Sequence, residues 1–154
     1  MTTGQDIIDA CEAEWDAYQS DCSGFAKAVA TRLGVTLTGM ANDIVGEIGQ
    51  APWSPLADGP TAAQAAALGR FVVAGLNGAN QQVPDPAHGH VVVVVQGPLA
   101  HELYPTAYWG QLGGVGKKDT TLNWAWTAAD RDKVVYGVID PPPQPDAGQG
   151  QNVS

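Results

Sequence analysis

Cys22 is the residue of this 154-residue chain best placed for covalent chemistry. A cysteine attacks as its thiolate, and the partial positive charge of a helix N-terminus, or a nearby imidazolium, lowers the pKa of the thiol. The segment Asp21-Cys22-Ser23-Gly24-Phe25 precedes an apolar pattern with helical spacing, so we expect Cys22 at the start of a helix. Free backbone N–H groups at that start would stabilise the oxyanion of amide hydrolysis.

A histidine must supply the base, and the chain contains three candidates. His90 directly precedes the run Val91–Val95, so we expect it on a rigid strand, and Gly89 before it leaves room for a close approach. His90 is therefore the predicted base. We expect His88 in a loop at the rim of the cleft, and the residues around His101 are typical of a surface loop.

A metal site is the alternative use of these side chains, because His88 and His90 would share one face of a strand. Cys11, Cys22 and His101 are the remaining imidazole or thiol ligands, and their spacings are unrelated to one another. We therefore expect neither a metal nor another cofactor. Both cysteines should be free thiols, with Cys11 buried in the apolar stripe of the first helix.

The order of predicted elements is helices first and strands second, which is typical of an α+β domain with an antiparallel sheet packed on the N-terminal helices. Helical patterns cover residues 5–18, 25–33, 40–48 and 61–68. Strand patterns cover 71–74, 90–95, 106–109 and 133–139, and Trp124 and Trp126 alternate as in a strand. The Gly- and Asn-containing stretches 77–87 and 110–121 are predicted loops.

The composition describes one folded domain, with 44% hydrophobic and 15% charged residues. We assign it to residues 1–140, and we expect the Pro-, Gly- and Gln-rich residues 141–154 to be a disordered tail. The net charge of −9 argues against nucleic acid or an anionic membrane as partner. The first residues lack the basic start and apolar stretch of a signal peptide, so we expect no ordinary secretion signal.

Two motifs together resemble a known enzyme class. Asp21-Cys22-Ser23-Gly24-Phe25 at a helix start, followed by Gly89-His90-Val91 at a strand start, is similar to the papain-like amidases of the NlpC type, which hydrolyse peptide stems of peptidoglycan. Over residues 5–139 the chain further resembles the first family of type VI secretion amidase effectors. The residues that carry this closer resemblance are Ala41-Asn42, Gly89 to Leu99, Tyr104-Pro105, Trp109-Gly110 and Asp130-Arg131-Asp132.

The resemblance implies a papain-like fold with Cys22 as nucleophile and His90 as base. It also implies that the substrate is the peptide stem of peptidoglycan, cut between D-glutamate and meso-diaminopimelate without a cofactor. Such an effector is made in the producer's cytoplasm and is delivered by type VI secretion machinery to the periplasm of a target Gram-negative cell. A cognate periplasmic immunity protein is the expected partner.

The group that orients His90 has no clear counterpart. The facing position in the family carries a cysteine, and this chain has Trp109 there. A tryptophan side chain cannot accept a hydrogen bond from an imidazole N–H, so we expect the Trp109 backbone carbonyl to do so, with His101 as the alternative. The predicted substrate-binding residues are Ser23, Asn42, His88, Tyr108 and Trp109.

Two other functional interpretations are compatible with these residues. A cysteine protease or a transglutaminase-like enzyme acting on proteins would employ the same Cys22 and His90 pair. A non-catalytic binding module would keep the fold without the activity. The cluster Asp130-Arg131-Asp132 is typical of a charged surface turn that opens the last strand rather than of a catalytic carboxylate pair.

Overall fold

Three of the four helices begin where a short polar side chain caps them. The computed structural model describes residues 1–143, so residues 144–154 of the predicted tail lie outside the described part. In the first helix, the Thr3 side chain and the Asp6 side chain form a reciprocal capping box. The Asp21 and Asp58 side chains cap the second and fourth helices. The helices are α1 (Gly4–Tyr18), α2 (Cys22–Arg32), α3 (Ala41–Glu47) and α4 (Gly59–Ala67).

Six antiparallel strands form one sheet in the order β1-β6-β2-β3-β4-β5. The strands are β1 (Ser54–Leu56), β2 (Phe71–Leu76), β3 (His90–Val94), β4 (Thr106–Trp109), β5 (Lys117–Thr121) and β6 (Val135–Ile139). The predicted α+β class is confirmed. The four long helical patterns and the four main strand patterns all appear, with ends displaced by a few residues.

Two predictions for the segment between β4 and β6 are wrong. β5 lies within the stretch 110–121 that was predicted to be a loop, because its sequence Lys-Lys-Asp-Thr-Thr has no apolar face and it pairs only with β4 at the sheet edge. The strand predicted from Trp124 and Trp126 does not form. Leu122–Trp124 is a 3₁₀ turn instead, with Trp124 68% exposed and Trp126 buried. The edge strand β1 was not predicted.

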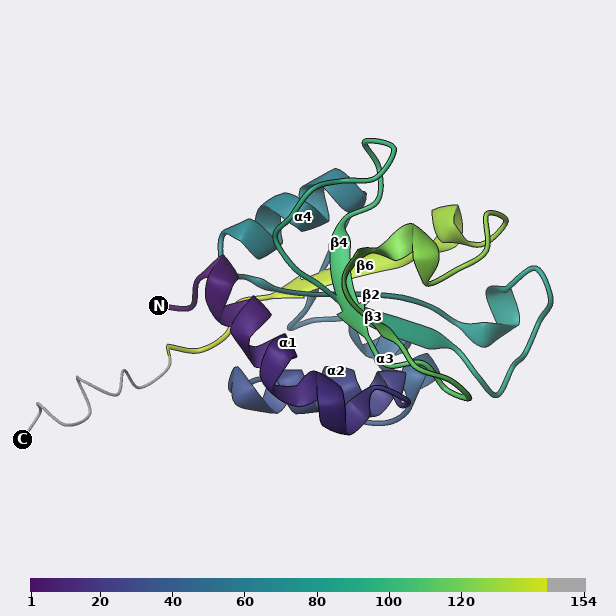
Figure 1. The fold of residues 1–154 in the computed structure, drawn as a ribbon, viewed down its shortest axis with the longest axis horizontal. Coiled ribbons are helices and arrows are strands. Elements are labelled where there is room, and N and C mark those ends of the chain that lie inside the picture. The colour runs from purple at the N-terminus through teal and green to yellow at the C-terminus, as the bar shows by residue number, and fades with distance from the viewer. Residues whose placement is uncertain (144–154) are drawn as a thin grey trace, which may run out of the picture.

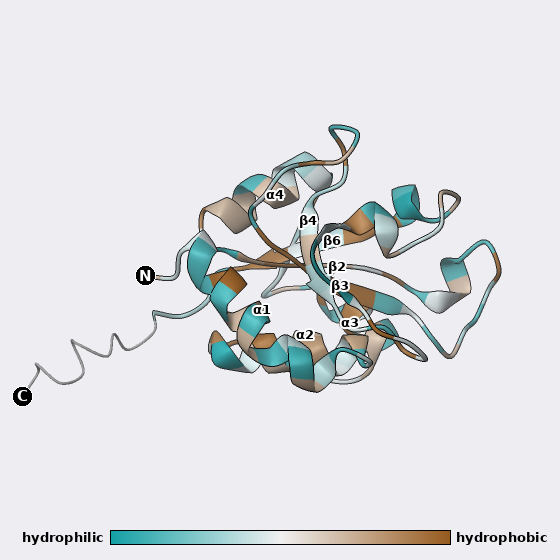
Figure 2. Cartoon of the chain, in the orientation of Figure 1, coloured by the Kyte–Doolittle hydropathy of each residue, from teal (hydrophilic) through white to brown (hydrophobic). Residues whose placement is uncertain are grey.

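The two faces of the sheet carry separate cores, because side chains alternate along each strand. Val91 and Val93 of β3 pack with the apolar faces of α1, α2 and α3. Val92 and Val94 pack on the other face with α4 and with Leu122. Figure 1 shows α1 to α3 on one side of the strands and α4 on the other. Figure 2 shows apolar colour along the central strands, while the helices alternate between polar and apolar residues.

The turn between α1 and α2 is docked on the end of β4. The indole Nε1 of Trp15 donates to the Trp109 carbonyl at 3.0 Å. The backbone N–H groups of Gln111 and Gly116 both donate to the Gln19 carbonyl, at 3.1 and 2.7 Å. These bonds hold the residues just before Cys22 against the sheet. Within residues 1–143 no helix is both long enough and apolar enough to cross a membrane.

Gly110 lies directly against the turn between α1 and α2, so a substitution at Gly110 tests this docking. A Cβ at this position would collide with the Tyr18 carbonyl and lie 2.6 Å from the Asp21 carbonyl. We therefore expect Gly110→Ala to lower the free energy of unfolding by about 2 kcal/mol, because the backbone must move apart. Gly114→Ala is the control, since the nearest atom would be 3.9 Å away. Denaturant unfolding measures both, and equal stability of the two variants would contradict the docking.

Candidate active site

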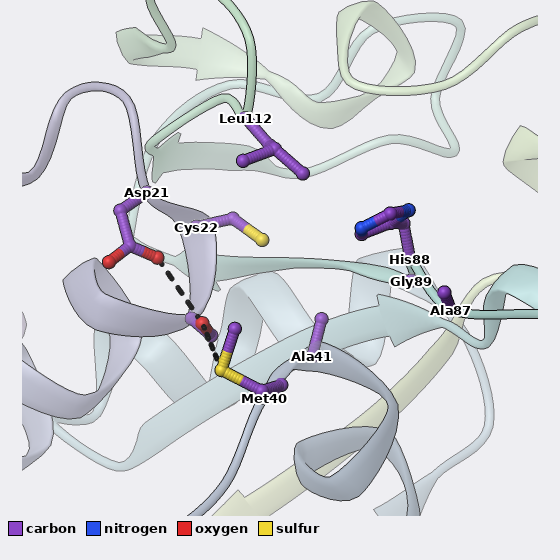
Figure 3. Close-up of a pocket in the computed structure, with 9 residues that line it drawn as sticks. Asp21, Cys22, Met40, Ala41, Ala87, His88, Gly89 and Leu112 are labelled. Atoms are coloured by element: carbon purple, nitrogen blue, oxygen red, sulfur yellow. Dashed lines mark hydrogen bonds between the residues drawn. The ribbon is translucent and has the colours of Figure 1, made fainter.

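The Cys22 side chain faces a small pocket of about 50 Å³. The pocket lies between the start of α2, the start of α3, residues 87–89 before β3, and Leu112. Figure 3 shows the sulfur directed into this space, with the His88 ring across from it. Cys22 begins α2, as predicted. A pocket of this size admits the few atoms of a reacting amide rather than a whole ligand.

The Cys22 thiol has a raised pKa, contrary to the expectation from its helix-start position. Burial is the largest cause, and the Asp21 carboxylate adds to it. The backbone N–H groups of Val91, Ser23 and Cys22 itself lower the pKa, but they do not offset the burial. The protein without substrate therefore holds Cys22 as a neutral thiol near pH 7.

His90 begins β3, as predicted, but its ring does not line the pocket. It packs against Trp126 and Trp109, with ring centroids 5.1 and 6.5 Å away. The start of β3 nevertheless touches the thiol, because the backbone N–H of Val91 lies against Cys22. Burial lowers the pKa of His90 to about 4, so its imidazole is neutral near pH 7.

The expected hydrogen bond from His90 to the Trp109 carbonyl is not formed. That carbonyl accepts from the Trp15 indole, and Nε2 of His90 is buried without a hydrogen-bond partner. His101 does not orient His90 either, since its exposed ring packs edge-on against Tyr104 at 6.1 Å. The orienting group of the family pattern therefore has no protein counterpart among the described residues.

His88 is the imidazole that the structure brings to the pocket. Its Nδ1 lies 3.0 and 3.2 Å from the two carboxylate oxygens of Asp85. Both side chains are about half exposed, so water and small molecules reach them. Sequence reasoning placed His88 at the rim but missed Asp85. The spacing Asp85-Pro86-Ala87-His88, with a proline that restrains the turn, is the signal that could have found it.

The other predicted substrate-binding residues divide into two groups. Ser23 lines the pocket, and its hydroxyl donates to the Asp21 carboxylate at 3.2 Å. Tyr108 and Trp109 do not line it, because both are buried in the sheet. The Tyr108 hydroxyl donates to Glu12 at 2.6 Å, which serves the packing of α1 on β4.

Asn42 also lies outside the pocket lining, and its role is to hold the loop that carries His88. Its side-chain amide donates to the Pro86 carbonyl at 2.8 Å and accepts from the Gly78 N–H at 3.0 Å. Gly89 permits this approach, because a Cβ there would collide with the Asn42 side chain. The Asn42 side chain therefore fills the space that Gly89, which has no side chain, leaves open.

Asp130 also anchors the loop at residues 77–89, through Gln82. Its carboxylate accepts from the Gln82 N–H at 2.8 Å and from the Lys133 ammonium at 3.0 Å. Asp130 is buried, so the prediction of a purely surface turn at residues 130–132 is wrong for this residue. The Thr127 hydroxyl also donates to this carboxylate at 3.3 Å. A buried carboxylate with three donors is a structural anchor.

The described residues contain no cluster of three or more histidine, cysteine, aspartate or glutamate side chains that could hold a metal ion. His88 and His90, which flank Gly89, lie in different surroundings: His88 lines the pocket, and His90 packs against Trp126. Cys11 and Cys22 are both free, as predicted. Cys11 is fully buried, and burial raises the pKa of its thiol well above the usual value.

Comparison with known proteins gives one informative relationship. The chain is 39% identical over 145 residues to the peptidoglycan amidase Tse1 of Pseudomonas aeruginosa, with 87% of this chain and 89% of that protein covered. The chain belongs to the first family of type VI secretion amidase effectors. No protein-family model matches it.

The two hydrogen bonds of Asn42 yield a prediction about the loop at residues 77–89. Asn42→Ala removes both bonds to the loop at residues 77–89, so we expect a loss of about 2 kcal/mol in the free energy of unfolding. Faster amide hydrogen exchange at Gly78 should accompany it. Asn80→Ala is the control in the same loop, because its exposed side chain lies away from these anchors. Unchanged exchange in Asn42→Ala would show that the anchor is not needed.

The neutral, buried His90 should make stability depend on pH. The unfolded chain takes up a proton near pH 6.5, whereas folded His90 does so only near pH 4, so protonation favours unfolding between these values. We expect the free energy of unfolding to fall by about 3 kcal/mol from pH 7 to pH 4 on account of this group. His90→Phe should remove that part of the slope.

Val138→Ala serves as the control for a general loss of packing, because Val138 is buried and does not titrate. It should lower stability by a similar amount at both pH values. Urea unfolding at pH 7 and pH 4 makes the comparison. An identical pH slope in wild type and His90→Phe would contradict the burial of a neutral imidazole.

Proposed function

We propose that this chain is a peptidoglycan amidase effector that hydrolyses the bond between D-glutamate and meso-diaminopimelate in wall peptides. Cys22 is the nucleophile and His90 is its base, within a papain-like fold of the NlpC type. The observation that carries the proposal is the Cys22 thiol, at the first residue of a helix and directed into a pocket at the start of β3. Family membership and the activity of Tse1 support the same conclusion.

The site can support amide cleavage without a preformed ion pair. Because the pKa of Cys22 is raised and that of His90 is lowered, the resting pair is a thiol and a neutral imidazole. His90 accepts the thiol proton as sulfur attacks the γ-carbonyl of D-glutamate. The C–N bond then breaks as protonated His90 gives this proton to the leaving amine, and an acyl-enzyme remains. Water attacks the acyl-enzyme with His90 accepting its proton, and the C–S bond breaks as the sulfur recovers a proton from His90.

The oxyanion of this step can be stabilised by backbone N–H groups at the start of α2. The N–H groups of Cys22 and Ser23 already lie close enough to the thiol to lower its pKa. They occupy the helix start, where the first N–H groups have no partner within the helix. Donors fixed in this way stabilise developing negative charge without reorganisation.

The biological setting follows from the family. We propose delivery by type VI secretion machinery from the producer's cytoplasm to the periplasm of a target Gram-negative cell. A cognate periplasmic immunity protein would protect the producer. The net charge of −9 favours a partner whose contact surface is basic.

Purified protein added to Gram-negative peptidoglycan tests the proposal. We expect release of fragments with a new amino group on diaminopimelate, identified by mass spectrometry, and a loss of roughly 10³-fold or more in Cys22→Ala. Cys11→Ala is the matched control. It removes the other thiol, which is buried in the core, and should leave activity per folded molecule unchanged.

Three results would contradict the assignment. Fragments that lack a new amino group on diaminopimelate would exclude the proposed bond. Cleavage of proteins but not of peptidoglycan would point to the protease interpretation instead. Undiminished cleavage by Cys22→Ala would exclude the cysteine mechanism.

A further inference from the structure

His90 is held by aromatic rings, because the described residues give it no hydrogen-bonding side chain. Nε2 of His90, but not Nδ1, is buried without a hydrogen-bond partner in the part of the chain that the structure describes. The imidazole meets the Trp126 ring edge to face, with the centroids 5.1 Å apart and the planes inclined by 66°. The Trp109 ring lies farther away, with its centroid at 6.5 Å. Trp126 is therefore the closer of the two rings that can fix the orientation of the imidazole.

We propose that Trp126 is the positioning residue of the Cys22 and His90 pair. The face of its indole ring receives the edge of the imidazole that carries Nε2–H, and this leaves Nδ1 free to take the thiol proton. The inference rests on the proposed function, because it assigns a partner to the base of that reaction. Trp126 acts through His90 and does not itself contact the reacting atoms.

The two ring nitrogens of His90 lie in different surroundings. Nδ1 is the nitrogen closer to the main chain, and the N–H of the next residue, Val91, lies against the Cys22 thiol. Nε2 is at the far edge of the ring and is the buried atom. A neutral imidazole carries one proton, so a proton held on Nε2 makes Nδ1 the acceptor. The tautomer that the reaction needs is therefore Nε2–H.

The indole N–H of Trp126 is not the group that holds His90. Nε1 of Trp126 is also buried without a hydrogen-bond partner among the described residues, so it does not donate to Nε2 of His90. Such a bond would require Nε2 without its proton and would leave the proton on Nδ1. In its absence, the contact is between the imidazole edge and the indole face, whose π electrons attract a ring N–H.

The same contact favours the imidazolium that forms during the reaction. When the thiol proton reaches His90 the ring becomes a cation, and a tryptophan face attracts a cation that lies within about 6 Å of its centroid. Trp126 lies inside this range and Trp109 lies outside it. Burial otherwise disfavours a charged His90. An attraction that arises only after proton transfer therefore promotes the step that generates the thiolate.

Hydrogen-bonded turns on both sides hold Trp126 in place. Before it, the Leu122 N–H donates to the Pro105 carbonyl at 2.9 Å, which ties the turn to the residue that precedes β4. After it, the Arg131 N–H donates to the Thr127 carbonyl at 3.0 Å. The Trp126 side chain is buried between these turns. The indole is thus in position before a substrate binds.

The tautomer of His90 tests the proposal without a substrate. Long-range proton–nitrogen NMR spectra near neutral pH distinguish Nε2–H from Nδ1–H, and the signals lost in His90→Gln identify this residue. We expect Nε2–H in the wild-type protein and in Trp126→Phe, which keeps an aromatic face but has no indole N–H. Trp126→Leu removes the face, so it should shift the tautomer ratio toward Nδ1–H by about tenfold and lower kcat/KM on wall peptides by about tenfold.

Trp53→Leu is the control for the loss of a buried indole. Trp53 is 3% exposed and packs against Phe71, with the ring centroids 5.7 Å apart. Phe71 begins β2, whereas His90 pairs with Leu76 at the other end of that strand. This substitution should lower the unfolding midpoint but leave the His90 tautomer and the activity per folded molecule unchanged.

The outcomes separate this proposal from the proposed function. An Nδ1–H tautomer in the wild-type protein would overturn the role of Trp126, as would an unchanged tautomer in folded Trp126→Leu. An equal shift in Trp126→Phe would assign the effect to the indole N–H, and an equal shift in Trp53→Leu would assign it to general packing, so either result also overturns it. If Trp126→Leu does not fold, the wild-type protein and Trp126→Phe still decide.

Activity of Cys22→Ala on peptidoglycan would instead overturn the proposed cysteine mechanism. The tautomer measured in the substrate-free protein would stand in that case, because it does not depend on which bond is cut. Nε2–H in the wild-type protein and in Trp126→Phe, with the shift confined to Trp126→Leu and no activity in Cys22→Ala, supports both proposals.

Discussion

The burial of β3 on both faces is the constraint on which the rest of the structure depends. Val91 and Val93 belong to the core beneath the first three helices, and Val92 and Val94 belong to the core beneath α4. A slip of one residue would exchange these two sets, so the register of β3 is fixed by both cores at once. That register brings the Val91 N–H to the Cys22 thiol and packs the His90 ring against Trp126.

The same constraint explains the unusual electrostatics of the site. Because α2 packs on the sheet, Cys22 is 7% exposed and His90 is also 7% exposed. Burial disfavours both the thiolate and the imidazolium, so the Cys22 and His90 side chains are both neutral in the resting site. The Asp21 carboxylate beside the thiol disfavours the thiolate further. Asp85 and His88 remain about half exposed, and His88 lines the pocket.

The loop from β2 to β3 forms one wall of the pocket. It carries His88 and Asp85, and its conformation depends on contacts with α3 and with the turn before β6. Its position is therefore set by elements far away in the chain, whereas the position of Cys22 is set by the start of its own helix.

Local patterns in the sequence were sufficient to predict the helices, the central strands and Cys22 at a helix start. Capping by Asp21 and the apolar spacing after it involve neighbouring residues only, and the Val91–Val95 run predicts a buried strand by itself. The edge strand β5 could not be predicted in this way. Its pairing with β4 comes from the tertiary structure, and its own side chains are polar.

The site beyond Cys22 was decided by the tertiary structure. Trp109 was expected to orient His90 through its carbonyl, but α1 brings Trp15 to that carbonyl from 94 residues away. The raised pKa of Cys22 likewise depends on how deeply the fold buries the thiol, which no local pattern reports. The sequence thus determined which residue could attack, because a helix start is a local property. Which imidazole faces the thiol was decided only by the packing of loop and sheet, because those contacts join segments far apart in the chain.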